Sequence, residues 1–89
     1  MKAVITVIGK DTVGILSKVS TACADVGANI IEVTQSVLQE LFAMIMLADI
    51  SNSTVAFDKL AKNLEKVGED NNLKIHVMHE DIFNSMHKI

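Results

Sequence analysis

Residues 9–16, GKDTVGIL, join two segments whose hydrophobic periods differ, and this change of period decides the fold. The run before them, AVITVI, is rich in β-branched residues and predicts a strand over 2–9. The run ILSKVSTACADVGA, which begins at Ile15 within this stretch, has helical spacing and predicts a helix over 13–26. Gly27 is expected to end that helix in the left-handed conformation. The predicted buried stripe of the helix consists of Leu16, Val19, Cys23 and Val26.

Alternating strand and helix patterns continue through the rest of the chain. Strands are predicted over 29–38, 41–50 and 73–79, and helices over 53–67 and about 81–88. The order βαββαβ plus a short C-terminal helix predicts an α+β, ferredoxin-like sandwich: a four-stranded antiparallel sheet with two helices on one face. Right-handed crossovers place the first and third strands at its centre.

Local signals refine these boundaries. Gln39 and Glu40 suit a short hairpin turn between the second and third strands. The stretch SNST, 51–54, offers N-cap oxygens to the second helix, and Gly68 is a plausible end for it. Asp81 is a possible cap for the C-terminal helix. The predicted stripe of the second helix is Phe57, Leu60, Ala61, Leu64 and Val67.

The third predicted strand is apolar on both of its faces. Ala43, Ile45 and Leu47 alternate with a second apolar set, namely Phe42, Met44, Met46 and Ala48. Two helices cover only one face of such a sheet, so the other face needs a partner. We expect the C-terminal helix, another subunit or both to cover it, and we expect a homodimer or higher homo-oligomer.

Composition limits the classes of function. The chain has 89 residues, enough for one domain over 1–89, with 49% hydrophobic residues and a net charge of −3. It has no basic run and only three aromatic residues, all phenylalanine, which argues against nucleic-acid binding. No apolar run approaches the ~20 residues of a membrane span. Its single cysteine, Cys23, excludes an internal disulfide and suits the reducing cytoplasm.

No catalytic, cofactor or metal site follows from the sequence. Residues 9–16 contain GxxxxG without the GK[ST] of a phosphate-binding loop, and the chain has neither the arginine of acylphosphatases nor a CxxC metal motif. Cys23 lies on the helix stripe as a core thiol. His76 and His79 are three apart on a strand and point to opposite faces. Met44 and Met46 are expected to fill the core or an interface, and we do not expect an enzyme.

The loop itself suits a small zwitterion. Gly14 lets the backbone come close to another group, and the helix N-terminus beyond it favours an anion such as a carboxylate. Asp11 adds an acceptor for an ammonium group. The simpler alternative is that Asp11 or Thr12 only caps the helix and Gly14 only allows close packing.

The chain resembles an ACT domain, a small regulatory module of amino-acid metabolism. The resemblance rests on DTVGIL at 11–16, on GANI at 27–30 and on the full-length element order. The start of the chain and the segment TQSVLQELFAMIMLADI, 34–50, are similar to a family of small stand-alone bacterial and archaeal ACT proteins. Val13 stands where many ACT domains have proline.

The resemblance implies a ligand-sensing module that regulates a partner. ACT domains typically pair, often side by side into one sheet, and bind amino acids at the interface. In the serine-binding members the ligand meets the first loop of one subunit and the start of the second strand of the other. The alternative is a pure interaction or oligomerisation module with a vestigial pocket. Carried onto this sequence, the expected ligand-binding residues are Asp11, Thr12, Gly14, Ile15 and Asn29.

Overall fold

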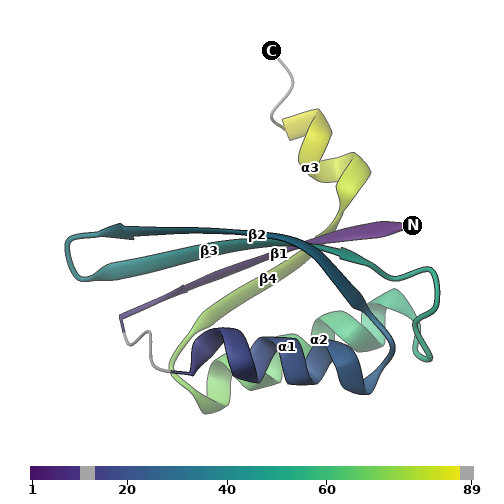
Figure 1. The fold of residues 1–89 in the computed structure, drawn as a ribbon, viewed down its shortest axis with the longest axis horizontal. Coiled ribbons are helices and arrows are strands. Elements are labelled where there is room, and N and C mark those ends of the chain that lie inside the picture. Colours follow the sequence, from purple (N-terminus) through teal and green to yellow (C-terminus); the bar gives the residue numbers. More distant parts are fainter. Residues whose placement is uncertain (11–13, 87–89) are drawn as a thin grey trace.

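The computed structural model describes residues 1–10 and 14–86 of the chain. It contains the predicted strands and helices in the predicted order (Figure 1). The C-terminal helix begins at Glu80, one residue before its predicted start, and the end of its predicted range lies outside the described residues. The elements are β1 (Lys2–Gly9), α1 (Ile15–Asp25), β2 (Asn29–Leu38), β3 (Leu41–Asp49), α2 (Phe57–Asp70), β4 (Lys74–His79) and α3 (Glu80–Met86).

The four strands form one antiparallel sheet in the order β2-β3-β1-β4, so the predicted central position of the first and third strands is confirmed. A turn at Gln39 and Glu40 joins β2 to β3, and Gln39 adopts a left-handed φ of 57°. α1 and α2 lie side by side against one face of the sheet, which gives the predicted ferredoxin-like sandwich (Figure 1).

The core lies between the sheet and these two helices. Met44 and Met46 of β3 are fully buried there, as predicted for core methionines. The stripe of α1 differs from the prediction at its start, because Ile15 is buried while Leu16 is 41% exposed. Either residue continues the helical spacing of Val19, so only the packing of the helix against the sheet decides between them.

Gly27 ends α1 in the left-handed conformation, with a φ of 78°, as predicted. The Ala28 N–H donates to the Cys23 carbonyl at 2.9 Å, and the Gly27 N–H donates to the Ala24 carbonyl at 3.1 Å. This pair of bonds is a Schellman motif, which satisfies carbonyls at the end of a helix. A Cβ at Gly27 would also lie 2.8 Å from the Asn52 carbonyl oxygen, so space as well as φ demands glycine.

The start of α2 differs from the prediction. Its N-cap is Ala56, and no side-chain hydrogen bond caps it in the described part of the chain. Ser53, one of the expected caps, instead donates to the Val55 carbonyl at 2.8 Å and accepts the Val55 N–H at 3.2 Å. The stripe of this helix is confirmed, since Leu60 and Leu64 are fully buried and its other members pack against the core.

The end of α2 also differs, because the helix passes through Gly68 and continues to Asp70. Gly68 is buried where the chain turns back into β4, and a Cβ there would lie 2.7 Å from the Leu73 carbonyl oxygen. The glycine is needed for this close approach of two backbone segments, and it does not stop the helix.

The second face of the sheet carries α3, which contacts β1 and β4 (Figure 1). Val4, on this face, is only 3% exposed, whereas Ile8 near the other end of β1 is 46% exposed. The expected cover from the C-terminal helix is therefore confirmed for one end of the face. Among the helices that the structure describes, none is long and apolar enough to cross a membrane.

Candidate functional site

The predicted ligand loop leads into α1, and Gly14 occupies the N-cap position of that helix. Its φ of 72° and ψ of 5° are left-handed, a conformation that glycine adopts at little cost. Among residues 1–10 and 14–86, a Cβ there would meet only the Lys18 side chain, at 4.0 Å. Backbone conformation therefore explains this glycine, and the described residues do not crowd the space beside it.

The start of α1 presents backbone N–H groups that a ligand can use. The first N–H groups of a helix have no partner within it and carry a partial positive charge. In the described part of the chain, no side-chain hydrogen bond caps this end and no acidic residue lies in its first turn. Such an end favours a carboxylate. Asp11 and Thr12, the expected acceptor and the alternative cap, lie outside the described residues.

The two other predicted site residues lie at different ends of α1. The Ile15 side chain is 3% exposed and packs in the core, which leaves only its backbone atoms for a ligand. Asn29 is exposed and begins β2, beyond the far end of the helix. α1 has 11 residues, about 16 Å of helix. One chain therefore does not bring Gly14 and Asn29 together, and a site that uses both needs two subunits.

β2 offers an edge along which two subunits can pair. It is the first strand in the sheet order, so one side of its backbone has no partner strand in the described chain. Its ladder with β3 is irregular between Ile30 and Glu32, and Ile31 and Val37 are 44% and 68% exposed. A long, exposed edge strand of this kind is a template for pairing with another chain.

Asp49 adds a negative charge beside Asn29. The two residues are opposite each other in the β2–β3 ladder. The Ser51 N–H donates to Asp49 Oδ1 at 2.9 Å. Hydrogen bonds from Ser51 hold the pKa of the Asp49 carboxyl below its usual value, so this group is ionised at neutral pH. The start of β2 therefore combines an amide with a nearby carboxylate.

The described cysteine and histidine residues do not come together in one place. Cys23 is fully buried, and burial raises the pKa of its thiol to about 11, which keeps it neutral and unreactive. His76 is exposed opposite Thr6, while His79 stacks on the Phe57 ring with centroids 3.9 Å apart. The two histidines thus lie on opposite faces, as predicted, and residues 1–10 and 14–86 contain no cluster of possible metal ligands.

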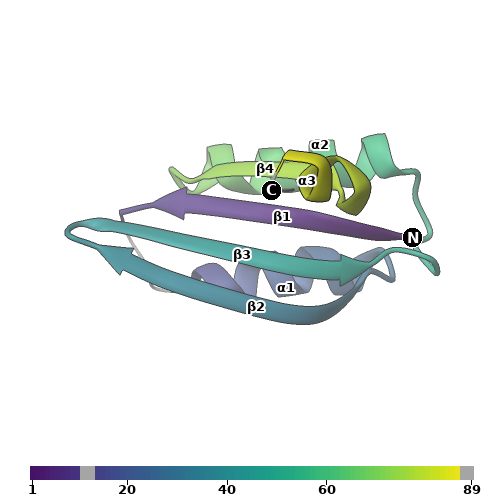
Figure 2. The ribbon, with the colours of Figure 1, turned by 90° about the horizontal axis from the view of Figure 1, so that it is seen from above.

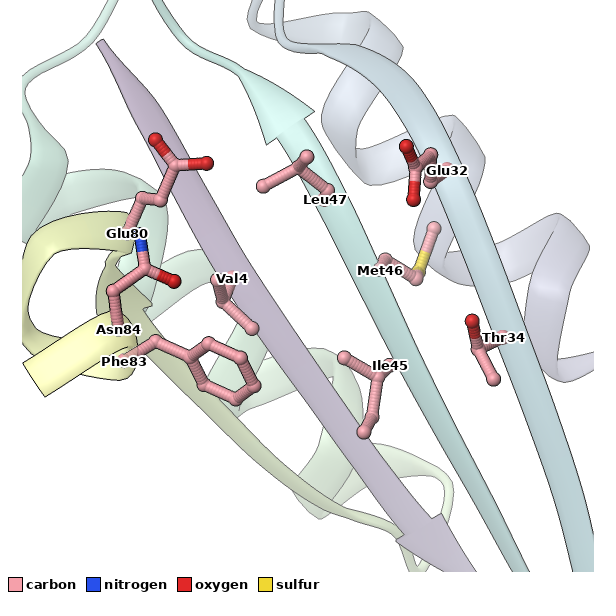
Figure 3. Close-up of a pocket in the computed structure, with 9 residues that line it drawn as sticks. All are labelled: Val4, Glu32, Thr34, Ile45, Met46, Leu47, Glu80, Phe83 and Asn84. Atoms are coloured by element: carbon pink, nitrogen blue, oxygen red, sulfur yellow. The ribbon is translucent and has the colours of Figure 1, made fainter. Parts of the chain in front are cut away.

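A hollow that the sequence did not predict lies on the face of the sheet that carries α3. It has a volume of about 190 Å³ and is bordered by β1, β2, β3 and α3 (Figure 3). The alternation of Ile45 and Leu47 predicted apolar side chains on this face, but no local signal predicted where α3 would stand. The lining residues are Val4, Glu32, Thr34, Ile45, Met46, Leu47, Glu80, Phe83 and Asn84.

Comparison with known proteins places this fold in one family. The family model described as ACT domain matches residues 2–78. A UPF0237 protein of Listeria monocytogenes is 47% identical over 89 residues, all of both chains. A UPF0237 protein of the archaeon Methanocaldococcus jannaschii is 48% identical over 88 residues, 99% of this chain and 98% of the relative.

A solved structure shows the same arrangement of the chain. The ACT domain protein from Streptococcus pneumoniae superposes with a TM-score of 0.82 at 40% identity, and the match covers 93% of each chain. Together with the family model, which reaches from β1 into β4 and ends before α3, this likeness covers nearly the whole fold. The chain therefore belongs to the ACT domain family, and the bacterial and archaeal relatives that it matches are small stand-alone proteins.

Proposed function

We propose that this chain is a single-domain, cytoplasmic regulatory module that binds an amino acid or a similar small ligand between two of its copies and regulates a partner protein. ACT domains are regulatory, ligand-binding modules, and stand-alone members are generally regulatory rather than catalytic. The single reduced, buried Cys23 suits a cytoplasmic protein.

The proposal is carried by the positions of Gly14 and Asn29 at opposite ends of α1, with β2 as a free edge between chains. β2 and β1 both pair antiparallel with β3, so they run in the same direction. If the β2 strands of two subunits pair antiparallel, the start of one β2 lies beside the end of the other. Asn29 of the partner subunit then lies at the end of the sheet where β1 ends and where Gly14 precedes α1.

This juxtaposition matches the two charges of an amino acid. The start of α1 provides N–H donors for a carboxylate, and the described residues leave space for it beside Gly14. The amide of Asn29 offers both a donor and an acceptor, so it can receive an ammonium group. Asp11, which precedes Gly14 in the loop, supplies a further acceptor in this proposal.

We expect calorimetry with the twenty amino acids to reveal a ligand whose binding depends on both subunits. Gly14→Leu should abolish binding, because its side chain fills the space at the start of α1. Asn29→Ala should weaken binding about tenfold or more, since it removes hydrogen bonds to a charged group.

Matched variants separate these effects from misfolding. Gly14→Ala carries the same backbone strain as Gly14→Leu with little bulk, so it should retain more affinity. Asn63→Ala removes an amide from α2, away from the proposed site, and should bind like the wild type. The site would be excluded if no amino acid binds, or if Gly14→Leu and Asn29→Ala both bind with the wild-type affinity. Either result would favour the alternative of a pure interaction module.

The oligomer is tested separately by light scattering. We expect a mass of at least twice the 9.7 kDa of one chain at high protein concentration. Gln35→Lys, in the middle of exposed β2, should shift the protein toward the monomer, because a lysine on an edge strand disfavours pairing with another strand. Ser85→Lys, exposed on α3, adds the same charge and should leave the mass unchanged. A wild-type protein that stays monomeric would contradict the proposal.

A further inference from the structure

The face of the sheet that points away from α1 and α2 is only partly covered. α3 lies over β4 and β1 at one end, while β3 and β2 remain open beside it (Figure 2). Val4, next to α3, is 3% exposed, whereas Ile45 on β3 is 43% exposed. α3 therefore forms a wall along one side of this face and leaves the apolar surface beside it accessible.

A hollow of about 190 Å³ lies beside that wall (Figure 3). The strand register builds its floor, because Val4 lies opposite Leu47 and Ile45 is the next residue of β3 on the same face. Phe83 extends from α3 toward Ile45, and Thr34 borders the other side from β2 (Figure 3). Pockets for drug-sized ligands measure roughly 300–1,000 Å³, so this hollow suits a smaller molecule.

Two carboxylates stand at one end of the hollow. Glu32 lies opposite Leu47 in the β2–β3 ladder, and Glu80 is the first residue of α3. Their side chains flank Leu47 from two sides (Figure 3). Among the residues that the structure describes, neither carboxylate has an ion-pair partner. The hollow thus combines an apolar floor with a negatively charged end, and this combination selects a ligand with the opposite charge.

We propose that this hollow binds a small organic cation, a primary amine on a short apolar chain. The apolar chain packs on Val4, Ile45 and Leu47, which removes exposed apolar surface from water. The ammonium group donates hydrogen bonds to Glu32 and Glu80. Hydrogen bonds between two charged groups are about twice as strong as neutral ones, so the charge adds to the affinity that the apolar floor supplies.

This second site is distinct from the proposed amino-acid site. The latter uses the start of α1, on the other face of the sheet, whereas the hollow lies on the face that carries α3. The hollow is complete within one chain, since all its lining residues belong to the same subunit. Gly14→Leu should therefore not change amine binding. Failure to detect amino-acid binding would not contradict the amine site, and failure to detect amine binding would not contradict the amino-acid site.

The probes are n-pentylamine, 1-pentanol and pentanoate, which share an aliphatic chain and differ in charge. We expect n-pentylamine to shift the backbone amide signals of Val4, Thr34, Ile45 and Leu47 in NMR spectra, with a dissociation constant on the order of 1 mM. 1-Pentanol should shift the same signals with about tenfold weaker affinity, because it carries no positive charge for the two carboxylates to attract. Pentanoate should bind more weakly still, since two carboxylates repel it.

Variants test whether the two carboxylates cause the preference. The double substitution Glu32→Gln and Glu80→Gln should weaken n-pentylamine binding about tenfold and make it equal to that of 1-pentanol. Glu40→Gln, in the turn at the far end of β3, removes a carboxylate away from the hollow and should change nothing. These substitutions lie outside the core, so the amide spectrum should otherwise stay the same.

Three results would overturn the proposal. The first is no shift of the lining residues by n-pentylamine. The second is equal binding of n-pentylamine and 1-pentanol by the wild type. The third is shifts that depend on protein concentration and not on the amine, which would show that a second copy of the chain occupies this face.

Discussion

The substitution Cys23→Asp is expected to destabilise the protein strongly at neutral pH. Cys23 is fully buried in the core between α1 and the sheet, and the part of the core that the structure describes contains no charged residue. An unpaired carboxylate at such a site should lower the free energy of unfolding by about 3–5 kcal/mol. Small domains are stable by only about 5–15 kcal/mol, so this loss removes much of the margin.

Urea unfolding followed by far-UV circular dichroism measures this effect, since the chain has no tryptophan or tyrosine for fluorescence. Ala24→Asp is the matched control, because Ala24 is exposed in the same turn of α1 and the same charge there should cost less than about 1 kcal/mol. All proteins should be compared at one concentration, since oligomerisation adds to apparent stability. Equal stability of the two variants would show that α1 does not bury this face.

The penalty at Cys23→Asp should also depend on pH. Burial raises the pKa of the new carboxyl in the folded state above its unfolded value of about 3.9. The folded protein then binds the proton more tightly than the unfolded chain, so stability falls as pH rises through this window. We expect the variant to recover part of its lost stability as pH is lowered toward 4, relative to wild type at the same pH.

Gly68→Ala is expected to destabilise the fold, although alanine normally favours a helix by about 0.5–1 kcal/mol over glycine. The new Cβ would lie 2.7 Å from the Leu73 carbonyl oxygen and 3.1 Å from Ile75 Cγ1. The Gly68 carbonyl accepts the Leu73 N–H at 2.8 Å, so the turn is held close to the helix. Relieving the clash should cost about 1–3 kcal/mol.

Thermal unfolding compares this variant with Glu69→Ala. Glu69 is exposed at the next position of α2, so its replacement changes the helix without meeting β4 and should stay within about 0.5 kcal/mol of wild type. A higher melting temperature for Gly68→Ala would mean that α2 and β4 do not pack as closely as the structure shows.

Most of the architecture could be predicted from local patterns. The two-residue period of β1 and β3 and the helical periods of α1 and α2 depend only on neighbouring residues, so the element order was correct. The handedness of crossovers then placed β1 and β3 at the centre of the sheet. Gly27 was assigned correctly because a glycine after a helical stripe is a common end signal.

The candidate site could be predicted only in part. The residue types around Gly14 and Asn29 indicated a small charged ligand, but the sequence did not show that α1 separates them by about 16 Å in one chain. Nor could periodicity position α3, so the hollow between Glu32 and Glu80 went unrecognised. Both features depend on contacts between segments that are far apart in the chain.

The sequence by itself determined the order of strands and helices, the family and the apolar character of both sheet faces, because each depends on the spacing of residues that are near one another in the chain. The tertiary structure alone decided that Ile15 rather than Leu16 enters the core, that Gly68 serves packing, and that α3 covers only part of the second face. The physical reason is common to all three. A local pattern predicts whether a residue favours a helix or strand and whether it favours burial. The space available to its side chain depends on the backbone and side chains that pack around it in the folded protein.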